Sequence, residues 1–304
     1  MAGNFVQLHN HTHYSLLDGA SKVPDLVKRV KELGMPAVGI TDHGNMHGAY
    51  ELWRAAVDSG VKPIIGIEAY VTPETARQDK TRVSWDTNWT PVPGHARNPD
   101  DVSGGGLITH LTMWAENDEG LVNLIKASSV ANLEGRVMRY PRMDKEVLST
   151  YSKGVIASSG CPSGIIQTRL RLGQFDEALR AAGEFQDIFG KDNFYIELMD
   201  HGLSIESKVT GDLLTIAKKL GAPLLATNDS HYVMEADKDA QDAMLCINSG
   251  ATLDDPNRFK FEGSGYYIKS AEEMRELFKD HPDACDNTLE IAERCNVIFD
   301  DHED

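Results

Sequence analysis

The stretch that decides the fold is Phe5-Val6-Gln7-Leu8-His9-Asn10-His11, in which a short hydrophobic segment ends in two histidines. Residues two apart on a strand face the same side, so both imidazoles can reach one ion. The pattern recurs: apolar stretches at residues 37–40, 64–67, 107–108, 155–157 and 223–226 precede further side chains able to bind metal. The complete candidate set is His9, His11, Asp18, His43, Glu68, His110, Cys161, Asp229 and His231.

Predicted strands alternate with predicted helices along most of the chain, which favours a parallel sheet with crossover helices. Helical spacing of apolar residues follows the first strand and recurs near residues 49–58, 119–131, 143–151, 174–189 and 205–220. Seven strands are expected, the sixth and seventh near residues 194–199 and 223–226. In a barrel of parallel strands the carboxyl ends converge on one face, so the nine candidate ligands can meet there.

Two regions interrupt this alternation. Residues 73–106 are rich in Pro, Gly, Asp, Asn and Arg, which predicts a long insertion loop, partly anchored by Trp85 and Trp89. From about residue 235 the pattern changes to a helix near 237–247, a turn-rich stretch, a short strand at 266–268 and two further helices. Ser270 and Glu273 have the spacing of a capping box. We therefore expect a barrel over residues 1–235, with the insertion 73–106, and a C-terminal extension over 236–304.

Composition restricts the class of protein. The 304 residues are 41% hydrophobic, enough for a sizeable core, and no apolar run approaches a membrane span. The N-terminus shows no secretory signal, and four unpaired-looking cysteines fit a reducing, cytoplasmic setting. A net charge of −17 argues against a general nucleic-acid binder. Three divalent metals would nevertheless bring roughly +6 against about −4 from the site's acidic ligands, leaving about +2 for a phosphate.

Each candidate has an alternative reading. His9 and His11 could be structural, Glu68 could face solvent from a half-exposed strand, and Asp18 and Asp229 could serve turns or caps. Cys161 could be an inert buried thiol or a nucleophile. If it is a ligand, thiolate and imidazole favour zinc over magnesium, while the carboxylates would also accept manganese or iron. A cluster of two or three metals suits hydrolysis of phosphate esters.

Four further residues are candidates for substrate contacts. His13 and His47 are close in sequence to the ligand motifs and could touch substrate or support ligands. His201 lies at the expected end of the sixth strand and could touch a phosphate. Arg169, together with Arg171, could face a phosphate, although a solvated helix face is the alternative reading for both.

The nine residues, read as His9-x-His11, Thr41-Asp42-His43, Glu68, His110, Cys161 and Asp229-x-His231, resemble the metal site of the PHP (polymerase and histidinol phosphatase) family. Longer runs at residues 16–20, 33–37, 62–66, 160–164, 266–270 and 291–295 are similar to the PHP domain of bacterial DNA polymerase III alpha subunits. Residues 101–104 and 110–113 are most similar to the actinobacterial form. The similarity covers nearly the whole chain and is weakest over residues 73–106.

This resemblance implies an α/β fold, a distorted (β/α)7 TIM-like barrel, with three divalent metal ions, of which zinc is favoured and manganese or iron fits part of the site. It assigns His9, His11, Glu68 and Asp229 to the first metal and makes Glu68 a bridge to the second, which His110 and Cys161 also bind. Asp18, His43 and His231 would hold the third. The polymerase core is absent from the chain, so no polymerisation is expected.

Three functions remain open at this point. The first is a 3′→5′ exonuclease that proofreads DNA with a metal-activated hydroxide, its partners being the DNA 3′ end, the rest of the alpha subunit and the replisome, with no membrane. The second is a catalytically silent domain that metals only stabilise. The third is a small-molecule phosphatase of the histidinol-phosphate type. The polymerase-like runs and the extension after residue 235 count against the third.

Overall fold

The computed structural model describes residues 4–15, 17–92 and 97–300, so the end of the expected extension, 301–304, lies outside the described residues. The elements of the barrel are η1 (His13–Ser15), α1 (Val23–Glu32), β1 (Ala37–Ile40), α2 (Ala49–Ser59), β2 (Lys62–Val71), α3 (Ser103–Gly106), β3 (Thr109–Ala115), α4 (Asp118–Glu134), β4 (Arg142–Met143), α5 (Lys145–Thr150), β5 (Val155–Ser158), α6 (Ile165–Arg171), α7 (Phe175–Phe189), β6 (Phe194–Leu198), α8 (Ser204–Leu220) and β7 (Leu224–Ala226). The later elements are η2 (Glu235–Asp237), α9 (Lys238–Ser249), α10 (Ala271–Leu277) and α11 (Pro282–Arg294).

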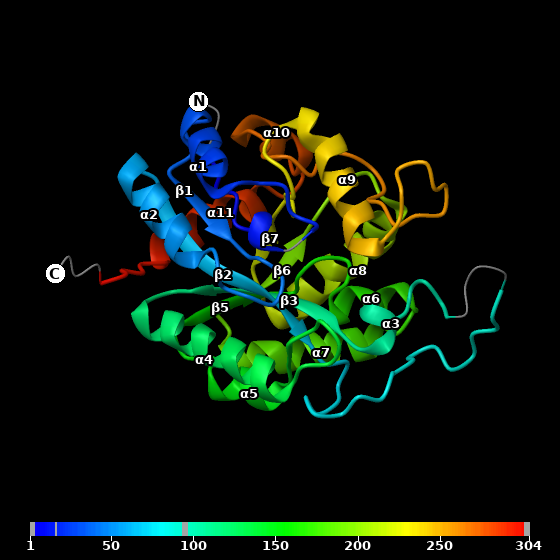
Figure 1. The fold of residues 1–304 in the computed structure, drawn as a ribbon. Helices are drawn as coiled ribbons and strands as arrows, with labels where there is room; N and C mark the ends of the chain where they lie inside the picture. The colour runs from blue at the N-terminus through cyan, green and yellow to red at the C-terminus, as the bar shows by residue number, and fades with distance from the viewer. Residues whose placement is uncertain (1–3, 16, 93–96, 301–304) are drawn as a thin grey trace.

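The fold is α/β, a curled sheet in the order β1-β2-β3-β5-β6-β7 with helices around it (Figure 1). The N-terminal segment closes the ring. On one side, the N–H groups of Gly39 and Thr41 donate to the carbonyls of Gln7 and Asn10. On the other side, His11 N–H donates to the Ser230 carbonyl, which follows β7. The predicted strand at residues 5–8 is therefore present as an extended segment of the barrel wall, which we call the N-terminal stave. It makes isolated bridges rather than a regular ladder.

One strand reverses direction. β3 runs antiparallel to both β2 and β5, while the remaining paired strands run parallel. His110 therefore stands near the beginning of its strand, and the sequence-based prediction that it follows a strand's end is wrong. The amino-terminal end of β3 lies at the edge where the parallel strands have their carboxyl ends, so His110 still lies at that edge. This reversal and the isolated bridges are what distort the barrel.

Two smaller predictions also differ. Met143, expected to begin a helix, lies in β4, which pairs with the end of β2 before α5 begins at Lys145. The strand expected at 266–268 is reduced to one bridge between Tyr232 and Tyr267. The capping box at Ser270 and Glu273 is confirmed, with the Ser270 hydroxyl accepting from Glu273 N–H at 3.2 Å.

The core has two parts. The larger part packs α1, α2, α4, α7 and α8 against the outside of the sheet. The smaller part fills the barrel interior with Leu8, Ile64, Trp114, Ile156 and Tyr195 among others, and α11 contributes Ile291, Ala292 and Cys295 to it. The Thr288 hydroxyl of α11 also accepts from Val6 N–H at 3.1 Å. The C-terminal helix thus seals the barrel at the end away from the candidate ligands.

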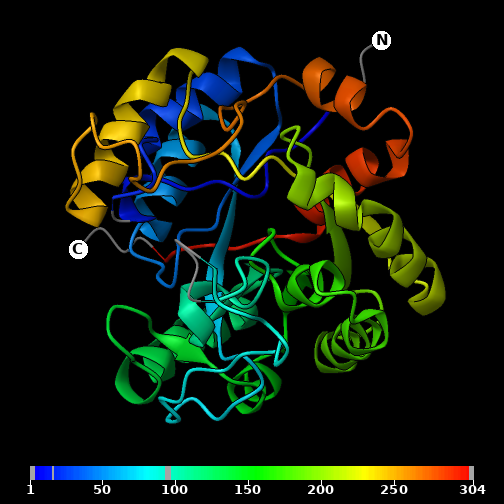
Figure 2. The same cartoon turned by 90° about the vertical axis from the view of Figure 1, so that its right-hand side faces the viewer.

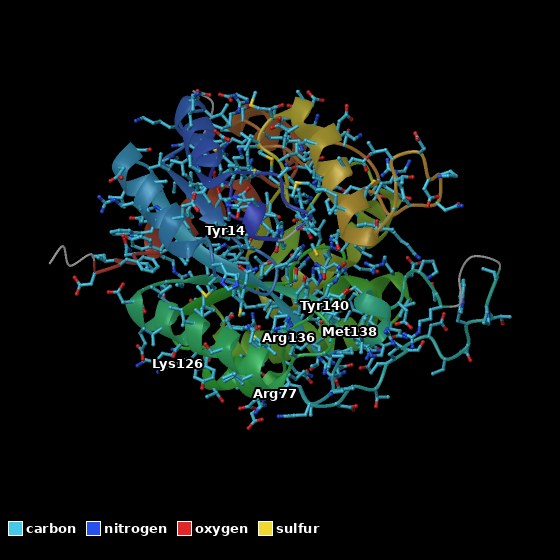
Figure 3. The ribbon with its side chains drawn as sticks, in the orientation of Figure 1. Tyr14, Arg77, Lys126, Arg136, Met138 and Tyr140 are labelled. Carbon is cyan, nitrogen blue, oxygen red and sulfur yellow. The ribbon has the colours of Figure 1, made fainter. Side chains whose placement is uncertain are left out.

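The described part of the insertion over residues 73–106 is anchored at several points. In Figure 2 it runs as a cyan segment across the face formed by the green helices. Arg142, completely buried, donates to the carbonyls of Arg77 and Asp79 at 2.7 Å each. Arg77, labelled in Figure 3, reaches Glu134, Asp144 and Glu146. Trp85 lies under the Arg169 guanidinium at 3.8 Å, which confirms that this tryptophan anchors the loop. Within the described part of the chain, no helix is long and apolar enough to cross a membrane.

Candidate metal centre

The nine candidate ligands meet at one edge of the barrel. His9 and His11 leave the N-terminal stave, His43 follows β1, Glu68 lies within β2, His110 begins β3, Cys161 follows β5, and Asp229 and His231 follow β7. Asp18 comes from the turn after η1, where Ala20 N–H donates to the His231 carbonyl at 2.7 Å. Side chains from seven separate segments are therefore close together although they are up to 222 residues apart in sequence (231 − 9).

Glu68 is at the middle of the cluster. Its carboxylate lies 3.6 Å from His9 Nε2, 3.4 Å from His11 Nε2, 2.7 Å from His43 Nδ1 and 3.1 Å from His110 Nδ1. The residue is completely buried, which excludes the solvent-facing alternative. Burial by itself would raise the pKa of Glu68, but the imidazoles of His110, His43 and His9 outweigh burial and hold that pKa well below its usual range. A buried carboxylate among several ring nitrogens is the position expected of a bridging ligand.

Three histidines present the same ring atom to the cluster. His9 Nδ1 lies 2.7 Å from the Glu197 carboxylate, His11 Nδ1 lies 2.8 Å from Ser15 Oγ, and His231 Nδ1 lies 2.8 Å from the Asp229 carbonyl. Each Nδ1 is thus engaged by an oxygen, and the network assigns the proton to it. The Nε2 atoms of all three are buried and have no hydrogen-bond partner among the described residues. This tautomer directs a free lone pair into the cluster, as in metal-binding histidines.

The remaining ligands extend the cluster in two directions. Asp18 Oδ2 lies 3.3 Å from His43 Nε2, and Asp229 Oδ1 lies 3.0 Å from His11 Nε2. Cys161 Sγ lies 3.3 Å from His110 Nδ1. Burial, followed by the carboxylates of Glu68 and Asp229, raises the pKa of the Cys161 thiol well above its usual value. A thiolate in this position therefore requires a cation beside it.

The donor atoms fit a metal centre. Buried atoms without a hydrogen-bond partner in the described residues include a carboxylate oxygen of each of Asp18, Glu68 and Asp229, in addition to the three Nε2 atoms. Leaving so many buried polar atoms unpaired is costly unless a ligand completes them. Three groups have donor atoms within 4.8 Å of one another and could each hold an ion: His9–His11–Asp229, His11–His43–His231 and His43–Glu68–His110. The groups overlap, since His11 belongs to the first two and His43 to the last two.

Several supporting residues were missed from the sequence. Glu197, completely enclosed in β6, accepts from Ser158 and Thr227 hydroxyls as well as facing His9. Asp42 accepts from the Ser15 hydroxyl at 2.9 Å and from Thr12 N–H at 2.6 Å, so it holds the partner of His11. Burial raises the pKa of Asp42 to about 6 in spite of these hydrogen bonds. The signal that singled out Glu68, a carboxylate inside an apolar strand, also applies to Glu197 and could have found it.

The four predicted substrate contacts lie in different surroundings. His201 is buried, with Nδ1 2.7 Å from Glu206 and Nε2 2.9 Å from the Asn228 carbonyl, so both ring nitrogens already have protein partners. Arg169 is also nearly buried, held by Glu74, Gln174 and the Trp85 ring, and Arg171 binds the Pro162 carbonyl. Neither arginine lies on a solvated helix face, and the surroundings of His201 and Arg169 do not favour contact with substrate. His13 is half-buried against Tyr14, and His47 is exposed after β1.

Comparison with known proteins decides the family. The PHP domain model matches residues 7–201, about two thirds of the chain. The chain belongs to the PHP domain family. The matched residues contain seven of the nine clustered side chains, and Asp229 and His231 lie beyond them.

Curated relatives of the chain include DNA polymerase III alpha subunits. The chain is 53% identical to the DNA polymerase III subunit alpha of Mycobacterium leprae over 298 residues, 98% of this chain and 25% of that protein. It is 55% identical to the same subunit of Saccharopolyspora erythraea over 291 residues, 95% of this chain and 24% of that protein. The similarity to actinobacterial alpha subunits is thereby confirmed. The chain spans about a quarter of the length of these relatives.

A solved structure is also similar to this PHP domain. It is a two-domain protein from Bacteroides vulgatus containing a predicted PHP-like metal-dependent phosphoesterase, at 12% identity and a TM-score of 0.41, covering 96% of this chain and 69% of that chain. A likeness at this level does not bear on the chemistry of the present chain.

Proposed function

We propose that this PHP domain is a metal-dependent 3′→5′ exonuclease that removes nucleotides from a DNA 3′ end during proofreading. The observation that supports this most strongly is the meeting of nine candidate ligands at one edge of the barrel, with buried nitrogen and oxygen atoms that have no hydrogen-bond partner among the described residues. A cluster of this size has more donors than a single structural ion uses, because structural zinc sites are closed by four ligands.

The proposed ligand assignment follows the one that the family resemblance implies. His9, His11, Glu68 and Asp229 would hold one divalent ion, Glu68, His110 and Cys161 a second, and Asp18, His43 and His231 a third. Imidazole nitrogens and one thiolate favour zinc, and the carboxylates allow manganese or iron in part of the site. The Glu68 position supports this assignment, since its carboxylate faces ligands of all three proposed ions.

When bound, divalent ions polarise phosphoryl oxygens and lower the pKa of water, which is the chemistry that phosphodiester hydrolysis requires. The chain's own residues supply orientation. The Glu197 carboxylate holds the His9 ring through Nδ1, and the Asp42–Ser15 pair holds the His11 ring in the same way. Both supports are buried, so they fix the tautomer and the direction of Nε2 before substrate arrives. His231 is oriented by its neighbour's carbonyl at 2.8 Å.

The proposed partners are a DNA 3′ end, the remainder of a polymerase III alpha subunit and other replisome components, acting in the cytoplasm. The net charge of −17 predicts weak affinity of this domain for DNA on its own. We therefore expect the rest of the polymerase to deliver the strand to the site, while the metal-laden edge attracts the phosphate locally.

The decisive experiment uses the 304-residue chain loaded with zinc, manganese or iron and a 5′-end-labelled primer with a mismatched 3′ nucleotide on a template. Stepwise shortening from the 3′ end supports the exonuclease. Failure of all three metals to give any shortening would contradict it and leave the structural role. Phosphate release from histidinol phosphate without shortening of DNA would instead identify a small-molecule phosphatase.

A further inference from the structure

A groove of about 420 Å³ lies beside the metal centre, between α9 and the segment 251–265, which leaves α9 as a gold-to-orange loop in Figure 1. Two residues that line it touch candidate ligands. Gln241 Nε2 of α9 donates to the Asp18 carbonyl at 3.0 Å, and the Phe261 ring meets the His231 ring edge-on with centroids 4.7 Å apart. The groove therefore adjoins the metal centre at Asp18 and His231.

Aromatic rings continue from this edge of the metal centre to the surface. Phe261 packs on Tyr266 at 5.0 Å and on Phe259 at 6.1 Å between ring centroids. Packing within the protein accounts for Phe261 and Tyr266, but Phe259 is 62% exposed. Phe259 does not itself line the groove, but it packs against Phe261, which does. A ring in this position offers a face on which an unpaired nucleobase can stack.

The charges of the groove differ from those of the protein as a whole. Its lining includes Lys238 and Lys260, while Arg258 and Asp242 form an ion pair and neutralise each other. Glu262 is the remaining acidic residue of the lining. Two ammonium groups beside an exposed aromatic ring, on a chain of net charge −17, combine the two features that single-stranded nucleic acid binding uses.

We propose that this groove is the subsite for the single-stranded 3′-terminal segment of a DNA strand. A nucleobase stacks on Phe259 next to the groove, and Lys238 and Lys260 in its lining contact backbone phosphates, which brings the next phosphodiester to the ligands Asp18 and His231. This inference rests on the proposed exonuclease function. A base in a duplex is stacked and paired, so the groove accepts a strand only after its end has frayed. Since a mismatched end frays at lower cost, the subsite distinguishes a mispaired 3′ end from a paired one.

The subsite is tested by binding, measured separately from cleavage. Fluorescence anisotropy of the zinc-loaded chain is recorded with a 5′-labelled oligothymidylate whose 3′-terminal linkages are phosphorothioates, and with a blunt duplex. Phe259→Ala and Lys260→Glu should each weaken affinity for the single strand about tenfold. Leu253→Ala, exposed on the same segment but with no ring on which a base can stack, and Lys191→Glu, after α7 and outside the groove's lining, are the matched controls and should bind as the wild type does.

The outcomes separate the two proposals. Wild-type affinity in both Phe259→Ala and Lys260→Glu overturns the subsite, and so does a loss in Lys260→Glu without a loss in Phe259→Ala, because the stacking contact would then be absent. If the wild type shortens DNA and the variants have the wild-type KM for a frayed end, the exonuclease stands and the subsite falls. If no DNA is shortened but Phe259-dependent binding persists, the exonuclease falls and the strand-binding groove stands.

Discussion

At residue 229 a carboxylate stands on a backbone with a φ of +43°, in the left-handed region. Asp and Asn tolerate this region better than other residues that carry a Cβ. The turn aims the Asp229 carboxylate at His9 and His11, at 3.4 and 3.0 Å. The turn-forming reading and the ligand reading of Asp229 are therefore compatible, because the unusual backbone is what brings the side chain to the cluster.

Asp229→Asn should abolish hydrolysis while the fold survives. The amide keeps the volume and suits the left-handed backbone, but it removes a charged ligand, so we expect a loss of more than about 100-fold in cleavage. Activity of metal-depleted and reconstituted protein is measured alongside circular dichroism and metal content. Asp212→Asn, exposed on α8, is the matched control and should leave all three unchanged. Near wild-type cleavage by the Asp229 variant would refute its role as a ligand.

Glu197 affects the metal centre indirectly, because it orients the His9 ring. Glu197→Gln keeps an oxygen for His9 Nδ1–H but removes the charge that favours this tautomer, so metal affinity should fall about 10- to 100-fold. Competition with a chelator of known affinity measures the loss. Glu206→Gln changes a carboxylate–histidine pair of equal length, 2.7 Å, that faces His201 instead of a candidate ligand. An equal loss of metal affinity in both variants would show a general effect of removing a buried charge.

At the scale of elements, the position of the N-terminal stave depends on a close approach of two backbones. A Cβ at Gly39 would lie 2.3 Å from the Leu8 carbonyl oxygen, so β1 accepts the stave only because residue 39 has no side chain. The same stave carries His9 and His11 immediately afterwards. A small change in the distance between β1 and the stave therefore moves two ligands together.

Gly39→Ala should destabilise the protein by about 1–3 kcal/mol, because the methyl group forces the stave away from β1. Thermal unfolding and metal content are the measurements, and both should fall. Gly211→Ala is the matched control, since nothing lies within 4 Å of a Cβ there. In the interior of α8 this change should be neutral or stabilise by up to about 1 kcal/mol. If the Gly39 variant melts at the wild-type temperature, the stave moves away from β1 without any loss of stability.

For the molecule as a whole, the ligands come from segments spread along the chain, and bound metals would tie the ends of the strands together. Removing metal with a strong chelator should therefore lower the melting temperature and stop cleavage. A ligand that binds only the native state adds about 2.7 kcal/mol per site at roughly a hundred times its Kd. Without cations, the carboxylates of Asp18, Glu68 and Asp229 are also clustered like charges. Lost activity with unchanged melting would show that the barrel is self-sufficient, and lowered melting without any DNA cleavage would favour the structural role.

Much of this protein follows from its sequence by itself. The alternation of apolar stretches and helical periodicity predicts the α/β barrel, and α2, α7 and α8 begin and end within a residue of the predicted limits. These features depend on residues near one another in the chain, as does the capping box at Ser270 and Glu273. The identity of the nine clustered side chains could also be predicted, because a polar residue able to bind metal next to or inside an apolar stretch is a local signal, even though Glu68 lies within β2 and His110 begins β3.

Only the tertiary structure decided how these pieces meet. A strand has the same alternating pattern in either direction, so the sequence could not show that β3 runs antiparallel and presents His110 from its beginning. The bridges of the N-terminal stave to both Val38 and Ser230, and the packing of α11 into the barrel, join residues far apart in sequence. Glu197 likewise acquires its role only through His9, 188 residues away. The physical reason is that hydrogen bonds and packing between distant segments, which set direction, closure and support, leave no periodic trace in either segment.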